Sequence, residues 1–268
     1  MTVQQTEPSH KKTLLWWKIL SAIAVFNICL WVTANYYLHS QVGELSQYTS
    51  WHLSLSGVYV AACAFRSFWP RIDLERYVIV DHWISSVVLG RSAATLAEIS
   101  FAIQMKLFID ELYTHTPGGF LQGYTWIIVF TLSLAQLFCW LGVISLNHLG
   151  HFIEESLWGL TFTLIMIALA TAIPSLDGTW LTISWLGMIA CFIYVLYMFC
   201  VDVPMYYQRM KKGKQGPEST SLSEQFSDAW SRRVLTRSWS IWKPEAVWLT
   251  GYFAAAVWLS LSLAFLPR

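Results

Sequence analysis

Charged residues are scarce in this sequence. Lysine, arginine, aspartate and glutamate make up only 12% of the 268 positions, whereas hydrophobic residues make up 56%; soluble domains carry roughly 25% charged residues. This composition excludes an ordinary soluble domain and favours a lipid bilayer as the solvent. The 17 Lys+Arg and 16 Asp+Glu leave a net charge of only +1, so the overall balance suggests neither a nucleic acid nor a strongly acidic partner.

Several motifs that would indicate a known chemistry are also missing. The chain contains no C-x-x-C pair and no H-E-x-x-H, and the last apolar segment, 245–265, has no lysine to form a Schiff base with retinal. The five cysteines lie inside apolar runs or at their ends, which is typical of small apolar residues rather than disulfides or a zinc site. They are Cys29, Cys63, Cys139, Cys191 and Cys200.

Apolar runs, by contrast, are abundant. Because about 20 mostly apolar residues cross the hydrocarbon core, the sequence predicts an all-α, polytopic transmembrane helix bundle of about seven spans. The third candidate is the least apolar, since it contains Arg91 and Glu98. The expected spans are 14–38, 51–69, 84–109, 124–146, 152–173, 180–203 and 245–265.

The basic residues predict the orientation of these spans, because cytoplasmic loops carry an excess of Lys and Arg. The N-terminal tail, the 70–83 connection and the 204–243 segment all contain Lys or Arg. The alternate loops contain none; these are 39–50, 110–123 and 174–179. Seven spans with a cytoplasmic N-terminus and an extracytoplasmic C-terminus put every basic loop on one side of a cell (inner) membrane.

This topology divides the chain into four parts. We expect a cytoplasmic tail over 1–13, a six-span bundle over 14–203, a basic cytoplasmic segment over 204–243, and a seventh span with a short outer tail over 244–268. Within the basic segment, the capping-box spacing of Ser221 and Glu224 predicts the start of an interfacial helix. That helix would serve as a lipid-binding element or as a linker. Among its arginines it would carry the apolar residues Phe226, Trp230, Val234 and Trp239.

Ionisable residues inside a membrane are costly and mark candidate functional sites. Arg91 and Glu98 are seven residues apart, so a helix places them on one face, about 10 Å apart along the axis. Small residues between them allow another helix to approach closely, which favours a protein-facing stripe. The pair fits a buried charge network that locks helices together, and it also fits a proton relay or a substrate site.

A second polar concentration lies at 147–155. On a continuous helix His148, His151 and Glu155 would share one face, with Glu154 to the side, although Gly150 can break that helix. The topology puts Asp81 and His82 on the same side of the membrane. Mixed nitrogen and oxygen donors suit a divalent metal such as zinc or iron, but a polar turn with carboxylates at a helix N-terminus or metal-free acid–base chemistry also fits.

Three functions follow from these residues. The first is a membrane-embedded enzyme that acts on a lipid or another hydrophobic substrate from the cytoplasmic leaflet. Its metal would be bound by Asp81, His82, His148, His151 and Glu155, and its catalytic residues would be Arg91, Glu98 and Glu154. The second is a small-molecule or proton-coupled transporter that uses Arg91 and Glu98. The third is an accessory or structural subunit of a membrane assembly.

The topology is testable with reporter fusions. A reporter joined after Lys214 should be active as a cytoplasmic fusion, and one joined after Arg268 should report the extracytoplasmic side, because only this arrangement collects the basic loops on one side. A cytoplasmic C-terminus would contradict the seven-span count.

Overall fold

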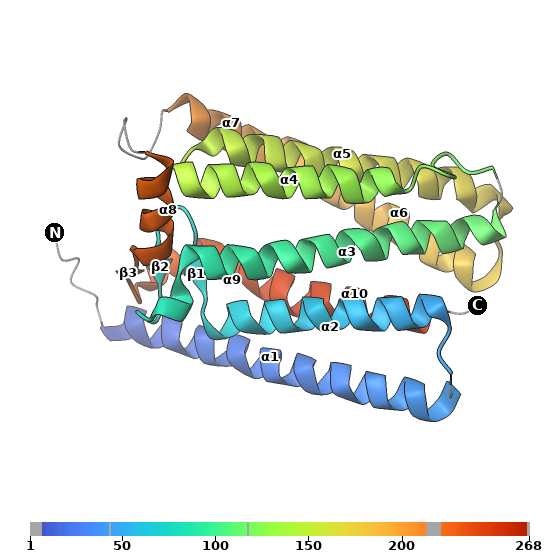
Figure 1. Cartoon of the computed structure of the whole chain (residues 1–268), viewed down its shortest axis with the longest axis horizontal. Helices are drawn as coiled ribbons and strands as arrows, with labels where there is room; N and C mark the ends of the chain where they lie inside the picture. Colours follow the sequence, from blue (N-terminus) through green and yellow to red (C-terminus); the bar gives the residue numbers. More distant parts are fainter. Residues whose placement is uncertain (1–6, 43, 117, 213–220, 267–268) are drawn as a thin grey trace. The chain divides into compact units, whose positions relative to one another are not determined.

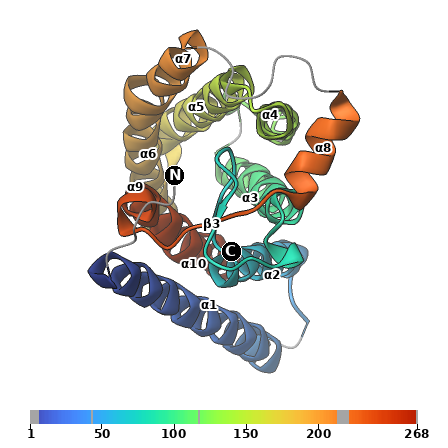
Figure 2. The ribbon, with the colours of Figure 1, turned by 90° about the vertical axis from the view of Figure 1, so that its left-hand side faces the viewer.

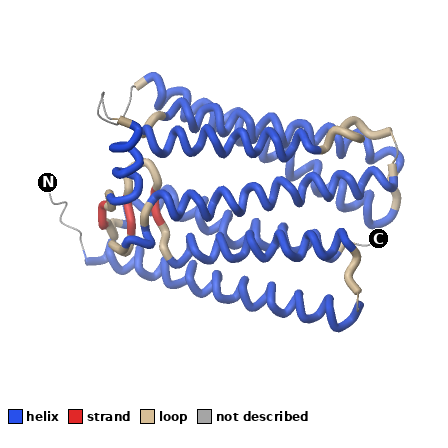
Figure 3. Tube along the Cα trace, viewed as in Figure 1, coloured by secondary structure: helices blue, strands red, loops and turns tan. Residues whose placement is uncertain are grey.

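The computed structural model describes residues 7–42, 44–116, 118–212 and 221–266, and long helices account for most of them (Figures 1 and 3). The expected all-α class is confirmed. The longest elements are α1 (Glu7–Val42), α2 (Gln47–Phe68), α3 (Val87–His115), α4 (Trp126–Ser145), α5 (His148–Ala172) and α6 (Gly178–Tyr197). The later ones are α7 (Val203–Lys211), α8 (Leu222–Ser231), α9 (Trp239–Thr250) and α10 (Ala256–Ser262).

Shorter turns complete or join these helices. Two π-helical segments, η3 (Met198–Asp202) and η4 (Gly251–Ala255), keep α6 continuous with α7 and α9 continuous with α10. The 3₁₀ turns are η1 (Trp83–Ser85), η2 (Ile173–Ser175) and η5 (Leu263–Phe265).

Six of the described helical segments are long and apolar enough to cross a membrane, which is consistent with an integral membrane protein. They are Ser9–Gln41, Val87–His115, Trp126–Ser145, His148–Ser175, Gly178–Lys211 and Trp239–Phe265. The third expected span, despite its two charges, is among them. The second is not: α2 has the required length, but His52, Arg66 and its serines lower its apolar character.

The helices pack into two compact units. Unit 1 comprises the chain up to Phe101 together with Phe226–Leu266, and unit 2 comprises Ala102–Gln225. Helix α3 therefore contributes its first half to unit 1 and its second half to unit 2. In unit 1, α9 and α10 pack against α1 and α2 although the sequence separates them by more than 150 residues.

Unit 1 contains a small sheet beside its helices. Strands β1 (Arg71–Ile72) and β2 (Tyr77–Val78) form an antiparallel hairpin, and β3 (Val234–Leu235) pairs in parallel with β2. Arg76, in the hairpin turn, has a φ of 60°, a left-handed conformation that non-glycine residues rarely adopt. Its Nη1 donates to the carbonyl of Asp73 at 2.8 Å, and its Nε donates to Asp228 at 3.1 Å. These bonds hold the turn.

This sheet corrects the expected interfacial helix. The capping box is confirmed, since the Ser221 amide donates to the Glu224 carboxylate at 2.8 Å and the Glu224 amide to the Ser221 hydroxyl at 3.3 Å. Helix α8 nevertheless ends at Ser231. Val234, expected on the helix, donates its amide to the carbonyl of Arg76 at 2.8 Å, and Trp239 begins α9. Pairing with β2 takes the backbone hydrogen bonds that a longer helix would need.

The other expected boundaries shift as well. Helix α1 begins at Glu7, inside the expected 1–13 tail, and the helix of the sixth expected span, 180–203, continues through Pro204 to Lys211. Proline lacks an amide proton and clashes with the carbonyl four residues earlier. The π segment η3, which directly precedes α7, accommodates this residue without ending the helix. Residues 1–6 and 213–220 of the expected cytoplasmic parts lie outside the described residues.

Unit 2 is organised around the pair α4 and α5, which run side by side in both Figure 1 and Figure 2. A Cβ atom on Gly150 would lie 2.5 Å from the Gly142 nitrogen and 2.5 Å from the Phe138 carbonyl oxygen. The sequence suggested that Gly150 could break this helix, but the structure shows no break there. Gly150 lies in the first turn of a continuous α5 and lets the two backbones touch.

We expect Gly150→Ala to lower the free energy of unfolding by about 1–3 kcal/mol, because the added methyl group has no space against α4. Thermal or chemical unfolding of the purified protein in detergent would measure this loss. Gly251→Ala is the matched control, since a Cβ at that helical position meets no atom within 4 Å among the described residues. Equal stabilities of the two variants would contradict the close contact.

Candidate functional site

The first turns of α5 carry three buried ionisable side chains. His148, His151 and Glu154 are 3%, 7% and 5% exposed. The helix begins at His148 because Asn147 caps it, with its side-chain oxygen accepting the Leu149 amide at 3.0 Å. Residues three positions apart on a helix are neighbours, so this start places His151 beside both of the others.

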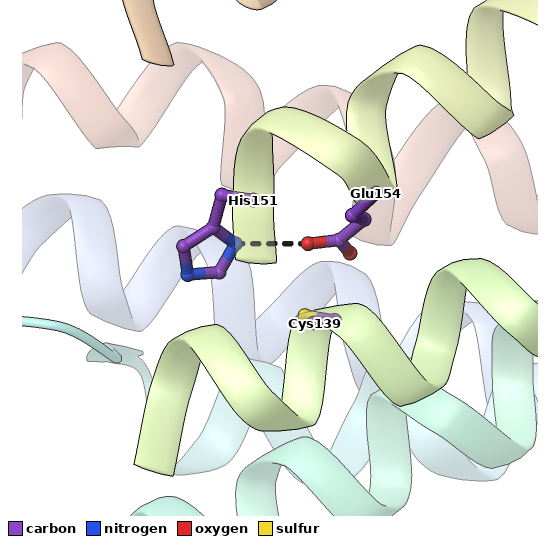
Figure 4. Close-up of side chains that lie close together, drawn as sticks. All are labelled: Cys139, His151 and Glu154. Carbon is purple, nitrogen blue, oxygen red and sulfur yellow. Dashed lines mark hydrogen bonds and ion pairs between the residues drawn. The ribbon is translucent and has the colours of Figure 1, made fainter. Parts of the chain in front are cut away.

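His151 and Glu154 form a buried pair that a third donor approaches. The His151 Nδ1 lies 2.8 Å from the Glu154 Oε2. Figure 4 shows both side chains on adjacent turns of α5, with Cys139 below them on α4. One donor atom from each of the three residues lies within 4.8 Å of the other two, and all three residues are buried. The three residues are therefore close enough to be candidate ligands of one metal ion.

Tyr206 covers the two imidazoles. Its ring lies 5.2 Å from the ring of His151 at an interplanar angle of 29°, and 6.2 Å from the ring of His148. Tyr206 belongs to α7, which reaches this position because the helix continues past Pro204. The Nε2 of His151 and the Nδ1 of His148 are buried and have no hydrogen-bond partner within the part of the chain that the structure describes. Buried polar atoms without partners are unusual in native folds.

No family model, curated protein or solved structure matches this chain. The assignment of a function therefore depends on the geometry of the chain's own residues.

The structure changes which acidic residue belongs to this cluster. The sequence pattern favoured Glu155 as a metal ligand and left Glu154 to the side. Instead Glu154 pairs with His151 and is buried, whereas Glu155 is only half-buried. The helical wheel cannot choose between them, because the facing helix decides which side of α5 is the interior.

Cys139 was missed because its apolar surroundings indicated a core residue. One signal was present in the sequence: Ala135, Cys139 and Gly142 are small residues at i, i+4 and i+7. Such a stripe marks the face of a helix that approaches another closely. The thiol therefore faces the start of α5.

The other expected ligands already have partners inside unit 1. Asp81 accepts a hydrogen bond from Arg233 Nε at 2.9 Å. The Nδ1 of His82 accepts the Ile84 amide at 3.3 Å and caps the turn η1. Their participation in one site with the α5 histidines stays a prediction.

Arg91 and Glu98 form the principal buried ion pair of α3. The Nη2 of Arg91 lies 2.6 Å from the Glu98 Oε1, and both residues are buried. The sequence predicted a shared face; the long arginine side chain spans the remaining distance. Tyr252 places its hydroxyl 3.5 Å from the same carboxylate oxygen. It lies in η4, where the wider π turn leaves the Phe253 carbonyl to accept from Asn27 at 3.2 Å.

A double-mutant cycle tests how strongly this pair is coupled. We expect Glu98→Gln to destabilise the protein by about 3–5 kcal/mol, because it removes the carboxylate that pairs with the buried Arg91 guanidinium. The double variant Arg91→Gln/Glu98→Gln should lose less than the sum of the single losses, with a coupling of about 1–3 kcal/mol in detergent unfolding experiments.

The matched control is the exposed pair of Arg233 and Asp81 in the same unit. Arg233→Gln and Asp81→Asn should show a coupling of at most about 1 kcal/mol, because water screens exposed charges. Additive losses at Arg91 and Glu98 would contradict a coupled buried pair.

Proposed function

We propose that this protein is a membrane-embedded, metal-dependent enzyme that acts on a lipid or another hydrophobic substrate. Its metal would be held by Cys139, His151 and Glu154. The observation that carries this proposal is the convergence of three buried donors of different chemistry from two helices. Helices α4 and α5 are both apolar enough to cross a membrane, so a substrate would reach this cluster through lipid.

The donor set suits a borderline divalent metal. Thiolate, imidazole and carboxylate ligands together are typical of zinc, and iron also accepts them. His151 and Glu154 now lie at hydrogen-bond distance. A metal would replace the proton between them, which makes its binding dependent on pH.

The number of donors supports catalysis rather than a purely structural role. Structural zinc sites usually have four protein ligands, whereas catalytic sites have three and keep one position for water. A bound metal would lower the pKa of that water and supply the nucleophile for hydrolysis. His148, buried beside Tyr206 and one turn from His151, would be the base that accepts the proton of that water.

Proton-coupled transport is the second candidate, favoured by the Arg91–Glu98 pair and the Tyr252 hydroxyl in unit 1. A buried carboxylate that exchanges an arginine partner for a proton is a common element of transporters. The two functions have different signatures. Transport requires substrate uptake into proteoliposomes that depends on Glu98, whereas the enzyme requires bound metal and turnover that depend on Glu154.

Metal analysis tests the proposal directly. Wild-type protein purified without chelators should contain zinc or iron close to one equivalent, and Glu154→Gln should retain at least about tenfold less after dialysis, because a ligand is lost. Glu155→Gln is the matched control. It removes the neighbouring carboxylate, which is half-buried, and should keep the wild-type metal content.

The pair of variants also separates the two sets of ligands considered above. Metal lost with Glu155→Gln but kept with Glu154→Gln would favour the ligand set expected from the sequence. Equal and substoichiometric metal in all three proteins would refute the metalloenzyme. If metal binds, mass spectrometry of a lipid extract incubated with wild type and Glu154→Gln should reveal the product class.

A further inference from the structure

Three guanidinium groups gather around one carboxylate in unit 1. The Nε of Arg71 lies 2.7 Å from the Asp73 Oδ1, and the Nη2 of Arg66 lies 3.8 Å from the Asp73 Oδ2. Burial acts to raise the pKa of the Asp73 carboxyl, but Arg66, Arg71 and Arg91 outweigh it and lower the pKa to about 2. All three arginines are buried, and Arg71 is only 2% exposed.

Two guanidinium groups of this cluster share one carboxylate. Arg66 and Arg71 both pair with Asp73, whereas Arg91 pairs with Glu98. Burial lowers the pKa of Arg71 to about 10, while Asp73 opposes the shift, so the side chain stays charged at neutral pH. An excess buried charge is costly unless a further anion compensates it.

Two of the arginines also have donors without acceptors. The Nη1 of Arg71 and the Nε of Arg66 are buried and make no hydrogen bond with any described residue. Arg66 is held from another side by the Phe253 ring, whose centroid lies 5.5 Å from its Cζ. Both donors belong to side chains that already contact Asp73, so they lie around a common point.

Helix α3 accommodates this arrangement through a glycine. A Cβ atom on Gly90 would lie 2.4 Å from the Cδ and 2.8 Å from the Nη1 of Arg71. The guanidinium therefore lies directly against the first turns of α3, next to Arg91. Amide groups at the start of a helix add partial positive charge to such a position.

We propose that Arg66, Arg71 and Arg91 form a binding site for a phosphate group. Guanidinium donors match phosphate oxygens in planar, charge-assisted pairs, and a phosphate offers more acceptors than the single carboxylate of Asp73. The site is independent of the proposed metal centre, which uses only residues of unit 2.

The position in the chain favours a lipid phosphate as the source. Arg66 lies in the last turn of α2, Arg91 in the second turn of α3, and Arg71 in the connection between them. The sequence predicts that this connection lies on the cytoplasmic side, where anionic headgroups of the inner leaflet attract basic residues. A soluble phosphate ester would use the same donors.

Binding experiments on the full-length protein in detergent test this site. The protein is titrated separately with short-chain phosphatidic acid, with phosphatidylcholine and with inorganic phosphate. Phosphatidic acid, the phosphate monoester lipid, should bind saturably and raise the melting temperature of the protein. Arg71→Gln should weaken this binding by about tenfold to a hundredfold, because one charge-assisted hydrogen-bonding group is lost. Binding of inorganic phosphate with similar affinity would identify a soluble phosphate as a sufficient ligand.

Two further variants separate position from charge. Gly90→Ala keeps every charge but displaces the Arg71 side chain, so it should weaken binding as well. Arg232→Gln removes an exposed arginine of the same unit and should leave the affinity unchanged. Equal affinities of wild type and Gly90→Ala, or an equal loss with Arg232→Gln, would refute a defined site. So would the absence of saturable binding to wild type, a result that does not depend on whether any variant folds.

Discussion

The cost of an uncompensated charge in a low-dielectric interior governs the architecture of this protein. A charge in the middle of a bilayer costs at least about 2.5 kcal/mol even on lenient scales. Arg91 and Glu98 meet at 2.6 Å, and Arg66 at the end of α2 shares Asp73 with Arg71 in the connection to α3. The first pair lies within α3, whereas Asp73 joins the end of α2 to the connection that follows it. Compensation of charge therefore determines the local arrangement of this part of unit 1.

Close backbone contact has the corresponding role in unit 2. Gly150 and Gly142 bring α5 against α4, and this contact places Cys139 beside His151 and Glu154. A larger residue at either glycine would separate the two helices and disperse the donors. The arrangement of these three donors is therefore a consequence of helix packing, and a change at a residue without any functional group can remove it.

Irregular helix turns lie beside both polar clusters. The π segment η3 and Pro204 precede Tyr206, which stacks on His151. The π segment η4 contains Tyr252, whose hydroxyl approaches Glu98. A π turn inserts one extra residue into a helix and rotates everything after it, and such turns are frequent at functional sites. In this protein they orient tyrosines towards buried ionisable groups.

The sequence by itself determined the helical class, the approximate limits of most long helices, the capping box at Ser221 and the shared face of Arg91 and Glu98. These features depend on local composition, on helical periodicity or on the cost of burying charge. Only the tertiary structure decided that Val234 pairs with a strand and that the buried Glu154 meets His151. It also placed Cys139 and Arg71 in polar clusters. The packing of one segment against another determines these outcomes. The local pattern of residues does not specify which two segments will pack together.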